Sequence, residues 1–131
     1  MQGRKKINLV QLFTEMNLTV IISDTDTVWM RNPFEYFKQY PEADILTSSD
    51  FLHYTHGDEG LEEPRDALSP FNIGIMMFSP KSASFARKWV EVIEADEKYW
   101  DQHAFNECAP SAWSSGKAQL VLTGNADLLS N

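Results

Sequence analysis

The sequence is poor in cysteine, in long apolar runs and in basic residues, and each shortage excludes a class of protein. The single cysteine, Cys108, rules out an intrachain disulfide. No apolar run approaches the roughly 20 residues of a membrane-spanning helix, so we expect no membrane segment in these residues. Eleven basic residues stand against 19 acidic ones, which gives a net charge of -8. Nucleic acids are bound through clustered Lys and Arg, so this balance argues against a nucleic-acid partner.

Apolar and aromatic residues are plentiful. Apolar residues make up 43% of the chain and aromatic residues 12%, which is typical of a folded globular domain. A chain of 131 residues has the length of one domain. We therefore expect residues 1–131 to form a single domain.

The spacing of apolar residues changes repeatedly along the chain. Helical spacing or helix-starting residues predict helices over residues 5–16, 33–40, 83–94 and 101–107. Apolar runs of strand length predict strands over residues 18–22, 43–47, 71–79 and 118–123. The polar stretch 53–69 predicts a long loop. Such alternation of helices and strands predicts an α/β fold.

The strand predicted over residues 18–22 leads into an acidic motif. Its five residues are continuously apolar and rich in β-branched side chains, which is typical of a buried parallel strand. Asn17 is expected to cap the preceding helix, and Asp24-Thr25-Asp26 follows the strand. Ligands of α/β sheets gather at the carboxyl ends of strands, so this turn is the first candidate for a site.

Asp24 and Asp26 are separated by one residue at the predicted end of a strand. Where the backbone turns, both carboxylates can face one hard cation. Mg²⁺ and Mn²⁺ take few carboxylate ligands and fill the remaining positions with water and substrate phosphates. We therefore predict a metal site at Asp24 and Asp26, although a solvated acidic turn is the simpler interpretation.

Two classes of enzyme use such a motif. In phosphatases resembling haloacid dehalogenases, Asp24 would be the nucleophile and Asp26 the acid or base, and Val28 also fits the pattern. In nucleotide-sugar transferases both aspartates would bind the metal. A phosphatase also needs a lysine followed by an acidic pair at a strand end, and no such pair follows Lys81. This difference favours a transferase.

Residues 24–33 resemble the Asp-x-Asp-x-x-Trp-hydrophobic-Arg-x-Pro core of the nucleotide-diphospho-sugar transferase family, which includes plant and algal arabinosyl- and xylosyltransferases of cell-wall polymers. Four further motifs of that family follow in its order: Ala43-Asp44-Ile45, Ser49-Asp50, Phe71-Asn72-Ile73-Gly74 and Asp101-Gln102-x-x-Phe105-Asn106. Each motif is weak alone, but their common order is specific.

The resemblance implies a GT-A-like mixed sheet flanked by helices. It also implies a Mn²⁺- or Mg²⁺-dependent, retaining transfer of a pentose-type sugar from a UDP-sugar to a glycan or glycoprotein. Members of the family generally lie in the Golgi lumen, held by an N-terminal membrane span that these residues do not contain. Carried over by position, the metal ligands are Asp24 and Asp26, the donor-sugar contacts are Asp50, Asn72 and Gly74, and the catalytic pair is Asp101 and Gln102.

The residue types suit these roles. The amide of Asn72 both donates and accepts hydrogen bonds, as sugar hydroxyls require, and Gly74 lets the backbone approach a ligand closely. Asp101 is expected to contact donor hydroxyls or stabilise positive charge at the anomeric carbon, with Gln102 on the reacting face. A simpler interpretation of Asp101 is a cap of the helix that begins there.

The sequence also departs from the family. Only 23 residues precede Asp24, whereas a GT-A enzyme opens with a strand–helix–strand unit that binds uridine. The later histidine that often ligates the metal is also missing, because no histidine follows His103. We therefore expect a domain that is incomplete at its N-terminus. A truncated, non-catalytic binding domain is a third interpretation.

Overall fold

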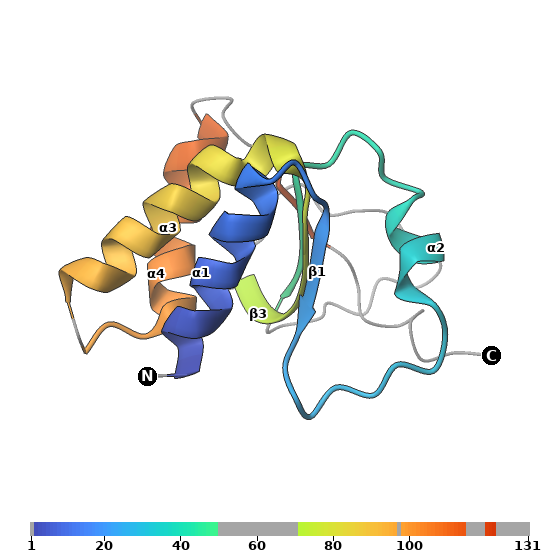
Figure 1. Ribbon diagram of the computed structural model, residues 1–131, viewed down its shortest axis with the longest axis horizontal. Coiled ribbons are helices and arrows are strands. Elements are labelled where there is room, and N and C mark those ends of the chain that lie inside the picture. The colour runs from blue at the N-terminus through green and yellow to red at the C-terminus, as the bar shows by residue number, and fades with distance from the viewer. Residues whose placement is uncertain (1, 50–70, 97, 115–119, 123–131) are drawn as a thin grey trace.

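A computed structural model describes residues 2–49, 71–96, 98–114 and 120–122 of the chain. Its helices are α1 (Gln2–Glu15), α2 (Pro33–Phe37), the short 3-10 helix η1 (Pro80–Ser82), α3 (Ala83–Ala95) and α4 (Asp101–Ser114). Its strands are β1 (Val20–Ser23), β2 (Ile45–Ser49), β3 (Phe71–Phe78) and β4 (Leu120–Leu122). Helices α1, α3 and α4 cover one face of the sheet and α2 lies on the other (Figure 1). The predicted α/β class is confirmed.

The four strands form one mixed sheet in the order β1-β3-β2-β4. Strand β3 is antiparallel to both β1 and β2, and β4 is parallel to β2. The carboxyl ends of β1, β2 and β4 therefore lie at the same edge of the sheet as the beginning of β3. We call this edge the carboxyl edge, and the predicted motifs after β1 and in β3 meet there.

The prediction of a buried parallel strand over residues 18–22 is wrong. Strand β1 begins at Val20, lies at the edge of the sheet, pairs antiparallel with β3 and is half-buried. Residues 20–22 of β1 are nevertheless continuously apolar, like those of a buried strand, because both faces of β1 are covered. Ile22 packs with the helices α1, α3 and α4, while Ile21 packs with α2 on the opposite face. An edge strand covered on both faces has the same apolar pattern as a central parallel strand.

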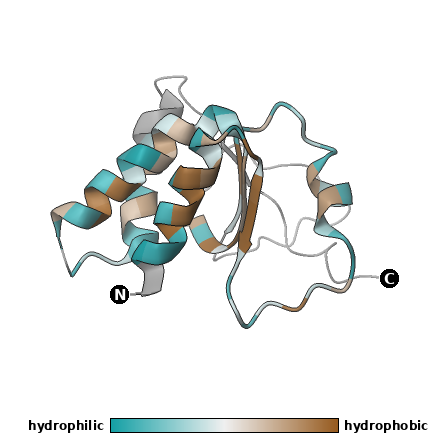
Figure 2. Cartoon of the chain, viewed as in Figure 1, coloured by the Kyte–Doolittle hydropathy of each residue, from teal (hydrophilic) through white to brown (hydrophobic). Residues whose placement is uncertain are grey.

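Two apolar clusters hold the layers together. The larger cluster joins β3 to α1, α3 and α4, and the smaller one joins Leu46 and Met77 to Phe37 of α2. Brown apolar segments mark the strands and the sheet-facing sides of the helices (Figure 2). Trp89 is fully buried in the larger cluster, where its ring lies against those of Phe78 and Phe105. The apolar face predicted for residues 83–94 is thus the face of α3 that packs on the sheet.

Local signals account for one end of α1 and one end of α2. Asn17 has a φ of 62°, and the N–H of Leu18 donates to the Phe13 carbonyl, so the predicted cap of α1 is confirmed. Asn32 caps α2 by accepting a hydrogen bond from the Phe34 N–H at 3.1 Å. Helix α4 instead runs past the predicted end to Ser114, with Pro110 inside it. An interior proline removes one intrahelical hydrogen bond and its ring crowds the carbonyl four residues earlier, so the continuation of α4 past Pro110 is not encoded by local propensity.

None of the described helices is long and apolar enough to cross a membrane. The long loop expected over residues 53–69 lies outside the described part of the chain.

The Trp89 indole offers a test of the packing between α3 and α4. Its Nε1–H donates to the Asp101 carbonyl at 3.0 Å, where α4 begins. Trp89→Phe keeps a ring but removes this donor and part of the buried volume, so we expect a loss of about 1–3 kcal/mol in the free energy of unfolding. Urea unfolding measures it. Trp100→Phe is the matched control, because Trp100 is 66% exposed, and an equal loss in both variants would contradict the packing.

Candidate functional site at the carboxyl edge of the sheet

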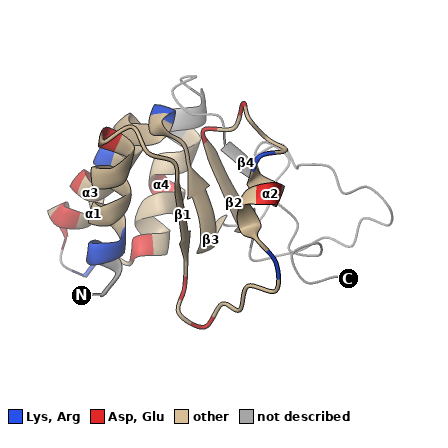
Figure 3. Cartoon of the chain, turned by 45° about the vertical axis from the view of Figure 1, so that its right-hand side comes forward, with Lys and Arg blue, Asp and Glu red and all other residues tan. Residues whose placement is uncertain are grey.

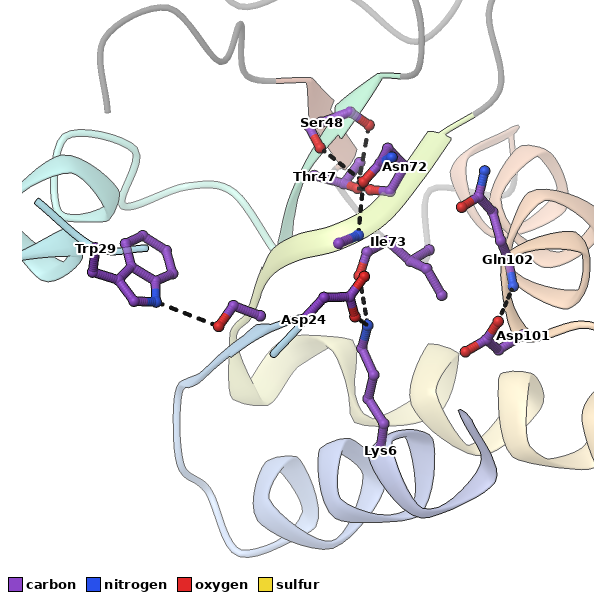
Figure 4. A network of polar contacts seen from close by, with 11 residues as sticks. Lys6, Asp24, Trp29, Thr47, Ser48, Asn72, Ile73, Asp101 and Gln102 are labelled. Carbon is purple, nitrogen blue, oxygen red and sulfur yellow. Dashed lines mark hydrogen bonds and ion pairs between the residues drawn. The ribbon is translucent and has the colours of Figure 1, made fainter. Parts of the chain in front are cut away.

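The candidate site is built where β1 ends, β3 begins and α4 starts (Figure 4). Acidic residues lie on the loop that follows β1 (Figure 3). Asp24 comes directly after β1, Asn72 and Gly74 lie in β3, and Asp101 and Gln102 open α4. The structure therefore brings together residues that stand up to 78 positions apart in the sequence.

Asp24 is fixed by its backbone as well as its side chain. Its N–H donates to the Gly74 carbonyl at 2.7 Å, and its carbonyl accepts from the Thr27 N–H at 3.2 Å, which closes a turn over residues 24–27. Its Oδ1 lies 2.8 Å from Lys6 Nζ, and the side chain is 52% exposed. One carboxylate oxygen is thus held by the protein while half of the side-chain surface remains open.

A bulge in β3 shapes the floor of the site. On the β2 side, Thr47 pairs with Met76 but Ser48 pairs with Asn72, so residues 73–75 protrude from the β2–β3 ladder. The Asn72 side chain stabilises this shape, because its Oδ1 accepts from the Gly74 N–H at 2.7 Å and from Ser48 Oγ at 3.4 Å. Bulges redirect side chains and often occur beside active sites. Here the bulge faces Asp24.

Gly74 allows two side-chain oxygen atoms to lie close to the backbone of β3. A Cβ at this position would lie 2.8 Å from Asn72 Oδ1 and 3.4 Å from Asp24 Oδ2. The first distance is a clash, so a side chain here would displace Asn72. Because Gly74 has no side chain, a carboxylate oxygen and an amide oxygen can both lie close to the same stretch of β3, and oxygen atoms of these kinds suit a hard cation or a hydroxyl-bearing ligand.

Asp101 and Gln102 occupy the first turn of α4. Asp101 Oδ1 accepts from the Gln102 N–H at 3.0 Å, which is the next residue's donor and not one of the N–H groups two or three residues on that a helix cap binds. An acidic residue in the first turn is also favoured by the helix dipole. Both side chains lie beside β3 in Figure 4. Asp101 thus has a structural contact that is compatible with a catalytic role.

Sequence reasoning missed the role of Asn106. Its Oδ1 accepts from the Phe71 N–H at 2.8 Å, and its Nδ2 donates to the Phe71 carbonyl at 3.1 Å and to the Gln102 carbonyl at 2.9 Å. This two-way contact fixes the first turns of α4 against the start of β3. Asn106 stood in a recognised motif, but only the fold reveals its partner.

The remaining predicted residues are less tightly placed. Asp26 is exposed within the same turn as Asp24. Asp50, predicted to contact the sugar, lies outside the described residues. Trp29 donates to Ser23 Oγ at 3.3 Å and packs in the smaller cluster, so it anchors the loop. Burial raises the pKa of the Cys108 thiol to about 11, which keeps it protonated and unsuited to nucleophilic catalysis.

The donor atoms at this edge fit a lightly ligated metal ion. Within the described residues, no group of three or more His, Cys, Asp or Glu side chains gathers that could hold a metal by itself. Mg²⁺ and Mn²⁺ in phosphate-transfer sites use one or two carboxylates plus water and substrate phosphates. Asp24 and Asp26, which share the turn over residues 24–27, would provide two such carboxylates.

A mixed α/β domain with an acidic turn and an Asn-x-Gly bulge at its carboxyl edge has the features of a nucleotide-sugar-dependent transferase. The chain belongs to the nucleotide-diphospho-sugar transferase family, whose model matches residues 1–123. This membership decides against the phosphatase interpretation of Asp24 and Asp26.

One curated relative is the arabinosyltransferase XEG113 of Arabidopsis thaliana, which is 37% identical over 107 residues. The match covers 80% of this chain and 17% of the relative, so the chain spans under a fifth of that protein. No solved structure matches the chain.

The two hydrogen bonds between the Asn106 side chain in α4 and the Phe71 backbone in β3, which we call the Asn106 clamp, can be tested by replacing Asn106. Asn106→Ala leaves the Phe71 N–H and carbonyl without their side-chain partners, so we expect the free energy of unfolding to fall by about 1–3 kcal/mol. The Phe71 amide should also exchange its hydrogen faster. Urea unfolding and amide hydrogen exchange measure the two effects. Asn8→Ala, at an exposed position of α1, is the control, and protection of Phe71 unchanged by Asn106→Ala would refute the clamp.

Proposed function

We propose that this domain transfers a pentose-type sugar from a UDP-sugar to a glycan or glycoprotein acceptor, with retention of configuration and with a divalent metal ion. The observation that carries the proposal is that Asp24 Oδ2 and Asn72 Oδ1 both lie close to Gly74 in the β3 bulge. Membership of the transferase family supports the reaction class. The name of the Arabidopsis relative, an arabinosyltransferase, supports a pentose donor.

Asp24 and Asp26 are the residues proposed to hold the metal, Mn²⁺ or Mg²⁺. Asp24 would use Oδ2, which lies next to Gly74, while Oδ1 stays with Lys6. Such an ion offsets the negative charge that develops on the departing diphosphate when the sugar–phosphate bond breaks. The hydrogen bond from the Asp24 N–H to the Gly74 carbonyl fixes the backbone from which the Asp24 carboxylate would bind the ion.

The donor sugar is proposed to lie over the β3 bulge. Asn72 Oδ1 accepts a hydrogen bond from the Gly74 N–H, and this bond fixes the orientation of the Asn72 amide at the bulge. Asp101 and Gln102 approach from α4, at a spacing from β3 that Asn106 maintains. In this arrangement Asp101 holds donor hydroxyls or stabilises charge at the anomeric carbon, and Gln102 faces the reacting bond. Asp50, which directly follows β2, is a further proposed sugar contact.

The family resemblance supports the Golgi lumen as the location of this reaction. Cell-wall polymers or glycoproteins would then be the acceptors.

A test of the donor sugar compares UDP release from UDP-arabinofuranose and UDP-xylose, with Asp101→Asn as the inactive reference. Release that is the same in both proteins would remove Asp101 from the site.

The metal proposal predicts the outcome of isothermal titration with Mn²⁺. Replacing both carboxylates in Asp24→Asn/Asp26→Asn should weaken Mn²⁺ binding by at least about tenfold, an effect that even outer-shell substitutions can reach. The matched control is Glu91→Gln/Glu94→Gln, which removes the same charge from the exposed surface of α3. Equal affinities in the two double variants would show that Mn²⁺ binds only to diffuse surface charge.

A further inference from the structure

Lys6 is a partly buried cation at the candidate site, and the proposed reaction assigns it no role. Its Nζ lies 2.8 Å from Asp24 Oδ1 and 2.7 Å from the Ile73 carbonyl, so it touches both the acidic turn and the β3 bulge (Figure 4). The Lys6 side chain is 19% exposed, whereas the side chain of Lys5, the preceding residue of α1, is exposed. The fold thus directs one lysine of the basic N-terminal stretch into the site.

The burial of Lys6 distinguishes it from the other paired basic residues. In the other ion pairs of the described part of the chain, the basic side chains are at least 60% exposed: Lys38–Glu35, Arg87–Glu15 and Lys88–Glu91. Exposed pairs of that kind contribute little to stability. A largely buried ammonium is held in place only when acceptors surround it, as Asp24 and the Ile73 carbonyl do here. Its position is therefore well defined before any ligand binds.

A fixed cation beside Asp24 has opposite effects on two classes of ligand. It repels a bare divalent cation that approaches the same carboxylate. It attracts a metal ion that arrives with a diphosphate, because the phosphates bring negative charge in excess. The ammonium has three N–H donors, and the two acceptors found within the described residues leave one for a ligand oxygen.

We propose that Lys6 is a second, protein-borne cation for the donor diphosphate, which discriminates against the bare metal ion and favours the metal–diphosphate complex. The proposal rests on the proposed metal site at Asp24 and Asp26. It assigns to Lys6 both a positioning contact with Asp24 Oδ1 and a direct contact with a phosphate oxygen. The Ile73 carbonyl keeps the ammonium in place in both states.

The test measures two affinities in each protein by isothermal titration calorimetry: Mn²⁺ alone and the preformed Mn²⁺–UDP complex. Lys6→Gln keeps a hydrogen-bond donor but removes the charge. We expect it to bind Mn²⁺ about fivefold more tightly and Mn²⁺–UDP at least about fivefold more weakly, because unit charges a few ångströms apart in water interact by an equivalent energy. Lys6→Arg, which retains the charge, should stay close to the wild type in both affinities.

Lys5→Gln is the control, since it removes the same charge from the exposed neighbouring position. A fall of both affinities in Lys6→Gln would mean that Lys6 only orients Asp24, and two unchanged affinities would mean that it has no role; either result overturns the proposal. If thermal unfolding shows that the Lys6→Gln variant is not folded, the same two affinities are measured for Lys6→Met. If the wild type binds neither ligand, the metal site itself fails, whereas binding that depends on Asp24 but not on Lys6 refutes this inference alone.

Discussion

The hydrogen bond from the Asp24 N–H to the Gly74 carbonyl is the contact on which the candidate site depends. It extends the β1–β3 pairing by one step beyond Ser23, into the turn that carries both aspartates. Because β3 bulges at residues 73–75, this bond places Asp24 against a stretch of backbone whose shape is set by Asn72. A slip of one residue in the register of β1 would turn the Asp24 side chain to the other face of the sheet.

The two apolar clusters explain why such an edge is rigid enough to support chemistry. Among the described strands, β1 pairs with β3 alone, yet its faces are covered by α1 and α2, which limits fraying. On the opposite side of the bulge, Asn106 fixes α4 to the beginning of β3. The acidic turn and the start of α4 are therefore both held by hydrogen bonds to the same strand, β3. Precise placement of this kind is what a transferase needs to orient its substrate.

Local signals in the sequence predicted most elements but not their arrangement. Five apolar residues on one face predicted α3 to within a residue at its C-terminal end, and Asn17 predicted the end of α1. The edge position and direction of β1 could not be predicted, since a strand covered on both faces gives the same apolar run wherever it lies. Lys6 stands 18 positions before Asp24, and only the packing of α1 on the sheet brings the two together. The motifs named the candidate site residues, whereas the Asn106 clamp depends on a contact across 35 positions that no local pattern encodes.

Paramagnetic broadening by Mn²⁺ in amide NMR spectra tests most directly whether the carboxyl edge is a metal site. Substoichiometric Mn²⁺ broadens the signals of nuclei near the bound ion. The arrangement described here predicts that the amides of residues 24–27 and of Gly74 broaden first, with Gln102 next and the exposed acidic face of α3 last. Broadening that begins around Glu91 and Glu94, or that spreads evenly over the acidic surface, would contradict a metal site formed by Asp24, Asp26 and the β3 bulge.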